Sequence, residues 1–129
     1  MKTKQIAVAV TLLVLGSSAL EVAQSQQAGV KRTEVQKHAL SVPGREIVQA
    51  HVDIAPGVEF PRHTHPGEEI VFVIEGALEY RIEGQPLVDL KAGESLFVPA
   101  GAVHGAKNAG TENAVVLATY IVEQGKPMA

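Results

Sequence analysis

The chain has 129 residues, of which 46% are hydrophobic and 19% charged, with five histidines and no cysteine. This length suits one ordinary domain, and the lack of cysteine excludes a disulfide framework, a thiolate metal site and a cysteine nucleophile. The formal net charge of -3 argues against nucleic-acid binding, which usually requires a basic face. With only 4% aromatic residues, a stacking platform for single-stranded nucleic acid is also unexpected.

The N-terminal segment has the order of a secretory signal peptide. Lys2 and Lys4 precede an apolar run over residues 6–15, and small residues follow that run. The run is too short to cross a hydrocarbon core of ~30 Å as a helix. Small residues allow cleavage after Ala19 or after Ser25, and we favour Ser25 because the residues around it are polar. Residues 1–25 are therefore predicted to be a signal peptide, with an uncleaved anchor as the alternative.

A cleaved signal peptide implies a secreted or periplasmic protein without stable membrane insertion.

From residue 30 onward, turn sequences rich in glycine and proline separate short apolar segments, and no segment has helical length. Residues 45–54 and 78–82 alternate between apolar and polar side chains, as strands with one buried face do. Residues 70–74 are apolar at every position, which predicts a strand covered on both faces.

The last apolar segment, residues 114–122, is rich in β-branched side chains and is therefore predicted to be a strand, although its length also fits a short helix. In total, the pattern predicts eight to ten short strands with frequent turns. Such a series is typical of an all-β sandwich or a closed barrel.

Two histidines, His63 and His65, are separated by one residue, and Glu69 follows after a Pro-Gly turn. On an extended strand such a pair leaves the same face, about 6–7 Å apart along the chain. Two imidazoles placed in this way can converge on one metal ion, and a carboxylate at the next strand can close the site. Taken alone, the pattern also fits surface histidines in a polar loop.

The glycine and proline spacing around these residues resembles the two sequence motifs of the cupin superfamily. The first motif, G-x5-H-x-H-x3-E-x6-G, runs from Gly57 to Gly76, and the second, G-x5-P-x-G-x2-H-x3-N, runs from Gly93 to Asn108. The resemblance covers residues 57–108 strictly and residues 30–125 in strand pattern. Residues 30–125 are therefore expected to form one cupin domain.

The resemblance implies an all-β fold, the cupin (RmlC-like) jelly-roll β-barrel, with one metal ion inside. Carried over position by position, the implied metal ligands are His63, His65, Glu69 and His104. Three imidazoles and one carboxylate suit a divalent transition-metal ion (Fe, Mn, Ni, Cu or Zn), and the ligand set does not choose among these metals. The motif glycines are expected to supply turn dihedral angles, Pro99 to end a strand and Asn108 to cap a turn.

Strand alternation predicts the surroundings of the metal. Val71 and Val73 share the face of Glu69, and Ala102 and Ala106 share the face of His104. The aromatic residues are candidates for the rest of the pocket, with ordinary core packing as the alternative: Phe60, Phe72, Tyr80, Phe97 and Tyr120.

Other charged residues are weaker candidates for the site. Arg62 and Arg81 are candidates to hold a substrate carboxylate, although such arginines are more often solvated charges on a strand face. Glu68 is a candidate acid or base that the strand geometry directs away from the metal. His38 and His51 lie outside both motifs and are expected at the surface.

Three functions fit this reading, because a fold does not by itself fix a chemistry. The motifs resemble those of small quercetin dioxygenase-like cupins, which implies a metal-dependent dioxygenase acting on a small enol or catechol-type substrate. A cupin isomerase or decarboxylase is an alternative that needs an acid or base, for which Glu68 and Tyr80 are the candidates. The third function is a non-enzymatic module that binds a metal or a small metabolite. By the same resemblance, residues 30–40 are expected to pair two copies into a homodimer.

Overall fold

The computed structural model describes residues 27–129, so the predicted signal peptide over residues 1–25 lies outside the described residues. The described chain forms strands β1 (Val30–Ala39), β2 (Arg45–Ile54), β3 (Glu59–His63), β4 (Gly67–Glu75), β5 (Ala77–Ile82), β6 (Val88–Lys91), β7 (Ser95–Val98), β8 (His104–Lys107) and β9 (Ala114–Glu123). Residues 27–129 contain no helix, and hence none that is long and apolar enough to span a bilayer. The predicted all-β class is confirmed.

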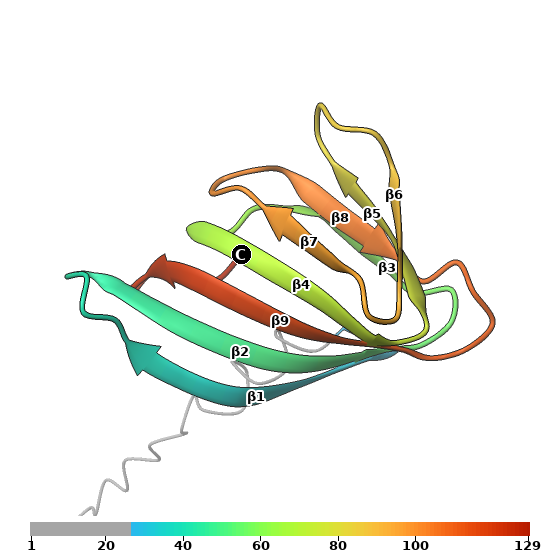
Figure 1. Cartoon of the computed structure of the whole chain (residues 1–129), viewed down its shortest axis with the longest axis horizontal. Coiled ribbons are helices and arrows are strands. Elements are labelled where there is room, and N and C mark those ends of the chain that lie inside the picture. Colours follow the sequence, from blue (N-terminus) through green and yellow to red (C-terminus); the bar gives the residue numbers. More distant parts are fainter. Residues whose placement is uncertain (1–26) are drawn as a thin grey trace, which may run out of the picture.

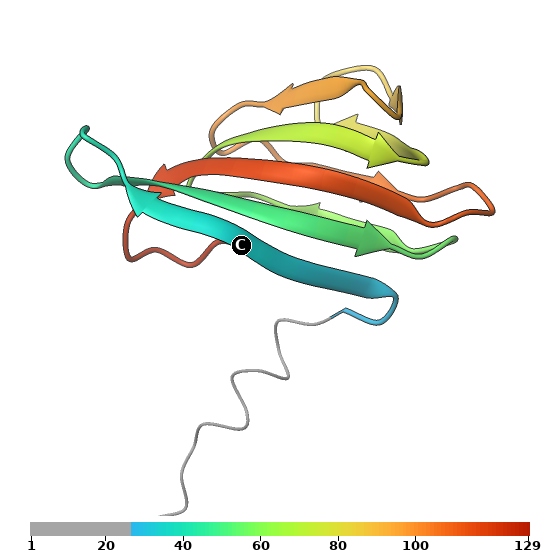
Figure 2. The ribbon, with the colours of Figure 1, turned by 60° about the horizontal axis from the view of Figure 1, so that its bottom comes forward.

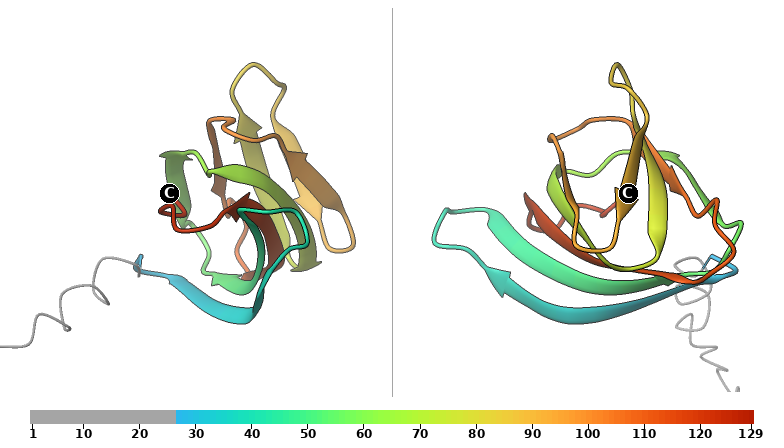
Figure 3. Two further views of the ribbon diagram at one scale, coloured as in Figure 1. Left: turned by 90° about the vertical axis from the view of Figure 1, so that its left-hand side faces the viewer. Right: turned by 45° about the vertical axis from the view of Figure 1, so that its right-hand side comes forward.

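The strands form two antiparallel sheets that face each other (Figure 1). The five-stranded sheet has the order β1-β2-β9-β4-β7, which Figure 2 shows from blue β1 to orange β7. The four-stranded sheet has the order β3-β8-β5-β6. Seen along the strands, in the left view of Figure 3, the two sheets curve around a common interior. This is the predicted jelly-roll barrel.

The interior is filled by one face of each strand. On β2, the buried positions alternate as predicted, and each is paired with an equally buried position of β9, as in Ala50 with Ala118 and Val52 with Val116. On β5, Leu78, Tyr80 and Ile82 fill the opposite side of the core. Because side chains alternate along a strand, this register decides which residues face the interior.

The prediction that residues 70–74 are covered on both faces is wrong. Val71 and Val73 are fully buried, but Ile70, Phe72 and Ile74 are each about 40% exposed on the outer face of β4. Phe97 on β7, the register partner of Ile70, is 57% exposed. The apolar run thus covers one buried face and one solvent-facing face, and an unbroken apolar run does not by itself distinguish this from burial on both sides.

Glycine allows two close approaches that position the site. At Gly67, an added Cβ would lie 2.0 Å from the carbonyl oxygen of Ile121, so only glycine lets β4 start this close to β9. At Gly76, the φ angle of 74° and the nearby Asn113 carbonyl require glycine in the turn from β4 to β5. The other three motif glycines, Gly57, Gly93 and Gly101, also have positive φ angles, as predicted.

The other structural expectations from the motifs are confirmed. β7 ends at Val98, directly before Pro99. The Asn108 side chain is 1% exposed, donates hydrogen bonds to the carbonyls of Ile54 and Glu112, and accepts one from the Gly110 amide. Asn108 therefore joins the turn before β9 to the end of β2.

Candidate metal centre

The four predicted ligands come from both sheets and one connection. His63 at the end of β3 and His104 at the start of β8 are register partners in the four-stranded sheet. Glu69 lies on β4, opposite Tyr120 of β9, in the five-stranded sheet. His65 lies in the connection between β3 and β4 and not in a strand, so the expected same-face pair on one strand is wrong. The chain turn after His63 brings His65 to the same point by a different route.

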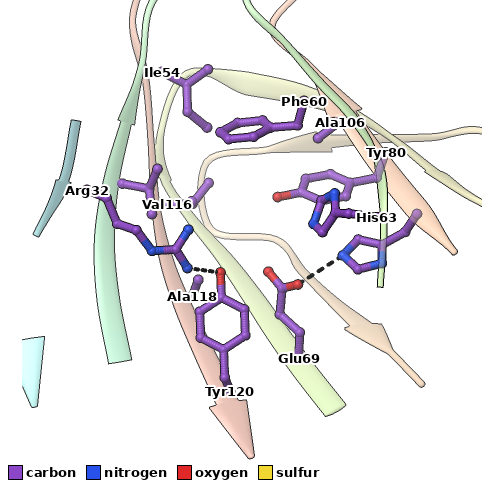
Figure 4. Close-up of a pocket in the computed structure, with 13 residues that line it drawn as sticks. Arg32, Ile54, Phe60, His63, Glu69, Tyr80, Ala106, Val116, Ala118 and Tyr120 are labelled. Atoms are coloured by element: carbon purple, nitrogen blue, oxygen red, sulfur yellow. Dashed lines mark hydrogen bonds and ion pairs between the residues drawn. The ribbon is translucent and has the colours of Figure 1, made fainter. Parts of the chain in front are cut away.

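The structure brings all four side chains together. The ring centroids of the three histidines are 4.3 to 4.9 Å apart, and one nitrogen of each ring lies within 4.8 Å of the others. The Glu69 Oε2 atom is 3.0 Å from His65 Nε2 and 3.1 Å from His104 Nε2. His65, Glu69 and His104 are buried, and His63 is half-buried. Figure 4 shows the Glu69 carboxylate pointing into the interior on the side where His63 lies.

Each histidine ring is held by a backbone carbonyl at its Nδ1 atom. His63 Nδ1 lies 2.7 Å from the Pro61 oxygen, His65 Nδ1 lies 2.6 Å from the Met128 oxygen, and His104 Nδ1 lies 2.9 Å from the Ala102 oxygen. A carbonyl oxygen only accepts hydrogen bonds, so each Nδ1 must carry the proton. In a neutral ring the Nε2 atom then presents its lone pair to the centre, as a metal ligand does.

This donor set fits a cation. Without one, the lone pairs of neutral His65 and His104 would face the Glu69 carboxylate at about 3 Å, an arrangement of acceptors only. The His65 Nε2 atom is buried and, although close to Glu69, lies outside hydrogen-bond geometry. A divalent ion among the nitrogens would give this buried atom a partner and would oppose the carboxylate charge.

When no metal is bound, protonated histidines can take its place beside the carboxylate. Burial alone would raise the pKa of Glu69, but the close contacts with His104 and His65 in their charged forms outweigh it and lower the pKa to about 2. Burial lowers the pKa of His63, which favours the neutral ring. For His104, burial acts in the same direction, but the hydrogen bond to Glu69 and the Ala102 carbonyl raise its pKa.

A small cavity of about 50 Å³ adjoins the cluster between the two sheets. His63, Glu69 and His104 line it on one side, and most of the remaining wall is apolar (Figure 4). Of the predicted lining residues, four face the cavity: Phe60, Tyr80, Ala106 and Tyr120. The others are elsewhere: Val71 and Val73 are in the core, Phe72 and Phe97 are on the outside, and Ala102 lies in the loop before β8.

The weaker candidates lie outside the cavity. Arg62 and Arg81 are exposed and line surface depressions instead. Glu68 lies on the opposite face of β4 from Glu69, as its neighbouring position predicts. His38 is exposed, and His51 lies on the outer face of β2, 3.5 Å from Asp53. Neither of these histidines approaches the centre.

Two kinds of group at the site were not predicted from the sequence. The first is Arg32 on β1, whose side chain reaches the cavity and donates to the Tyr120 hydroxyl (Figure 4). The second is the set of carbonyls that hold the rings. Two of these carbonyls precede their histidine by two residues, a local spacing that sequence reasoning can use in hindsight. The Met128 carbonyl and Arg32 lie 63 and 88 residues from their partners, and no local signal identifies them.

Comparison with known proteins identifies the architecture. Residues 50–120 match the family model of the cupin domain. A germin-like protein of Morus alba is 39% identical over 84 residues, which are 61% of this chain and 40% of that protein. This chain spans about two fifths of the length of the first curated relatives it matches.

Two solved structures of enzymes share the fold. An oxalate oxidase in complex with glycolate is 28% identical, with a TM-score of 0.61 over 81% of this chain and 56% of its own. The dimethylsulfoniopropionate lyase DddQ of Ruegeria pomeroyi is 28% identical, with a TM-score of 0.59 over 64% of this chain and 42% of its own. An oxidase and a lyase on one architecture show that the fold alone does not select the reaction.

Proposed function

We propose that this chain, which belongs to the cupin family, holds one divalent transition-metal ion through His63, His65, Glu69 and His104 and acts as a metal-dependent enzyme on a small molecule. The observation that carries the proposal is the orientation of the three rings. Each Nδ1 is held by a backbone carbonyl, so the three Nε2 lone pairs are available at one buried point beside a carboxylate.

The reaction that this site supports best is that of an oxygenase on a small enol or catechol-type substrate, as in quercetin dioxygenase-like cupins. A bound transition-metal ion supplies a Lewis acid and, for iron, manganese or copper, a redox centre. The protein contributes a largely apolar wall beside the predicted ligands, formed by side chains of both sheets such as Ile54, Val116 and Ala106. The Tyr120 ring packs edge-on against His65, with centroids 4.9 Å apart, and fixes one side of the centre.

The alternative of an isomerase or decarboxylase depends on a protein base at the cavity. Glu68 is on the wrong face of β4, and burial raises the pKa of Tyr80 well above its ordinary value, so its hydroxyl keeps its proton. Burial likewise raises the pKa of Tyr120, to about 12. Both phenols therefore suit hydrogen-bond donation to a bound oxygen atom rather than proton abstraction. This favours a reaction in which the substrate is activated at the metal centre.

The test combines metal analysis with oxygen consumption. Protein purified from its native compartment should contain close to one equivalent of one transition metal, and this protein should consume oxygen with a small enol, catechol or β-diketone. Metal at full occupancy with no oxygen uptake on any of these would contradict the oxygenase reaction and favour a binding module. Protein without bound metal under all loading conditions would contradict the metal centre itself.

Export and self-association remain proposals. The signal-peptide pattern of residues 1–25 supports export to the periplasm or beyond, and the mass of the mature protein would show cleavage after Ser25 or Ala19.

A homodimer is supported by β1, an edge strand of the five-stranded sheet that is exposed along almost its whole length. Sedimentation of the mature protein as a monomer at all concentrations would contradict the dimer.

A further inference from the structure

We propose that the outer face of β4 and β7 is a surface through which two copies of this chain associate face to face. The face carries four exposed apolar side chains, here called the outer cluster: Ile70, Phe72, Ile74 and Phe97. The inference does not depend on the metal centre. It assigns self-association to a surface other than the β1 edge, because β1 and β7 are opposite edges of the five-stranded sheet.

The outer cluster is contiguous. Ile70 and Phe97 are register partners on neighbouring strands, and Ile70, Phe72 and Ile74 follow one another on the outer side of β4. The three residues of β4 are 40–42% exposed, and Phe97 is 57% exposed. Figure 2 views the five-stranded sheet from outside, and no other part of residues 27–129 buries these side chains. On a soluble protein, an apolar cluster of this kind marks an interaction site.

The composition of β4 is that of a strand covered on both faces. Val71 and Val73 fill the barrel interior, and the three outer-cluster residues that alternate with them are equally apolar. In the same barrel, β5 alternates buried apolar residues with polar ones, as expected for a strand with one solvated face. The layer that would cover the outer face of β4 must therefore come from outside the described chain.

The shape of the face matches a second copy of itself. Phe72 is the register partner of Ser95, and Ile70 is the register partner of Thr119, so each of these large side chains has a small neighbour. Two sheets pack face to face about 10 Å apart, with strand directions within about 30° of each other. In a two-fold contact between identical faces, large side chains of one copy can enter the spaces above the small side chains of the other.

The charge pattern also favours a second copy. Strands β4, β7 and β9 contain no lysine or arginine, which an anionic membrane surface or an acidic partner would require. The outward positions around Ile70 and Phe72 carry no charge of either sign, and Glu68 lies at the end of the face. Two copies can therefore meet at the outer cluster without repulsion between like charges.

The area suits the core of a stable dimer interface. Such an interface buries about 800 Å² on each partner, of which roughly 55–65% is apolar. At its exposed fractions, the outer cluster presents roughly 350 Å² of surface. The half-buried Leu117 and Ile121 of β9 adjoin it. Toward β1 the face becomes polar, and Gln49 donates a hydrogen bond to the Thr119 hydroxyl 3.0 Å away, as suits the rim of an interface.

The first experiment measures the assembly of the mature protein by sedimentation over a range of concentrations. Wild-type protein should associate. A double variant with Phe72→Gln and Phe97→Gln should halve the assembly, from dimer to monomer, or from tetramer to dimer if the β1 edge also pairs. The dissociation constant should rise about 100-fold, because each copy loses two aromatic residues from the centre of the contact. Leu87→Gln is the matched control: Leu87 is 46% exposed but lies between β5 and β6, so the assembly should not change.

A second measurement keeps both aromatic side chains in place. Because the chain has no cysteine, a single Ile70→Cys variant can be labelled with a charged maleimide at one position only. Its labelling rate should fall severalfold from dilute to concentrated protein, as the fraction of assembled protein rises. Leu87→Cys should be labelled at the same rate at every concentration. This measurement decides the question if the double variant does not fold.

Each other outcome overturns the interface. Unchanged assembly in the folded double variant, or a labelling rate of Ile70→Cys that does not depend on concentration, would assign self-association to the β1 edge instead. Wild-type protein that is monomeric at all concentrations would exclude both interfaces. Monomeric wild-type protein that binds to phosphatidylcholine vesicles would assign the outer cluster to a lipid surface. All these outcomes leave the metal centre in place, because metal content is measured separately.

Discussion

The Nδ1 atom of His65 lies 2.6 Å from the carbonyl oxygen of Met128, which follows it by 63 residues. The Met128 side chain also packs against the hydrophobic core. The segment after β9 therefore returns to the barrel and fixes both the rotation and the tautomer of one predicted ligand. Contacts of this kind orient metal ligands, and their loss typically lowers metal affinity about 10- to 100-fold.

The first prediction is that removal of residues 126–129 weakens metal binding while the barrel still folds. His65 would lose the acceptor for its Nδ1 proton and could turn or change tautomer. Competition titration with a chromogenic chelator should show an affinity for zinc about 10- to 100-fold lower. An unchanged affinity would mean that the Met128 contact does not position His65.

Two variants separate the carbonyl contact from other effects of this segment. Met128→Ala keeps the backbone carbonyl but removes the side chain from the core, so it should lower the melting temperature more than the metal affinity. Lys126→Gln removes only an exposed ion pair with Glu123 and should change neither property measurably.

The second prediction concerns the proposed ligands. His104→Ala and Glu69→Gln should each reduce the metal content of purified protein strongly, because the metal loses one nitrogen or one charged oxygen. Inductively coupled plasma mass spectrometry measures the metal content per protein chain. His51→Ala is the control: this histidine lies on the outer face of β2, so its loss should leave the metal content unchanged. Full metal content in His104→Ala would contradict the site.

Much of this molecule was predictable because its patterns are local. The alternation in residues 45–54 identified the buried face of β2, and the motif spacing identified four side chains that the fold does bring together. The turn glycines were recognisable for the same reason, since a positive φ angle is a property of one residue and its neighbours.

What escaped prediction depends on contacts that are distant in sequence. Ile70 and Phe72 are exposed because no other part of residues 27–129 forms a third layer outside β4, which no residue of that strand encodes. Arg32 reaches the cavity because β1 pairs with β2 in one particular register, so it was missed while Arg62 and Arg81, closer to the motifs, were considered. Proximity to a motif along the chain is a poor guide to proximity in a barrel of two sheets.

The third prediction concerns Asn108, the last residue of the second motif. Asn108→Ala should destabilise the protein by about 2–4 kcal/mol, because it leaves the buried carbonyl of Ile54 and the partly buried carbonyl of Glu112 without their donor. Urea unfolding measures the loss. Asn113→Ala, which removes an exposed contact to Asp53, should cost much less. Equal losses in the two variants would mean that the Asn108 network does not hold the turn.

The fourth prediction concerns the acid stability of the metal-free protein. The pKa of Glu69 is lowered to about 2, below its ordinary value of 4.5, so the folded state binds fewer protons than the unfolded state between these values. The contribution of Glu69 to stability is thus complete above pH 4.5 and is lost as the pH falls through about 2. The raised pKa of His104 acts oppositely: its contribution is present below 6.5 and is lost as the pH rises through the folded-state value.

Urea unfolding in the presence of a chelator, from neutral pH down to about pH 3, should therefore show a steeper loss of stability in wild-type protein than in Glu69→Gln. The difference accumulated over this range should be on the order of a few kcal/mol. Glu123→Gln, which removes an exposed carboxylate, should follow the wild-type curve closely. If Glu69→Gln loses stability in acid as steeply as wild-type protein does, then the buried carboxylate is not ionised beside the histidines, and the charge distribution described for the centre is wrong.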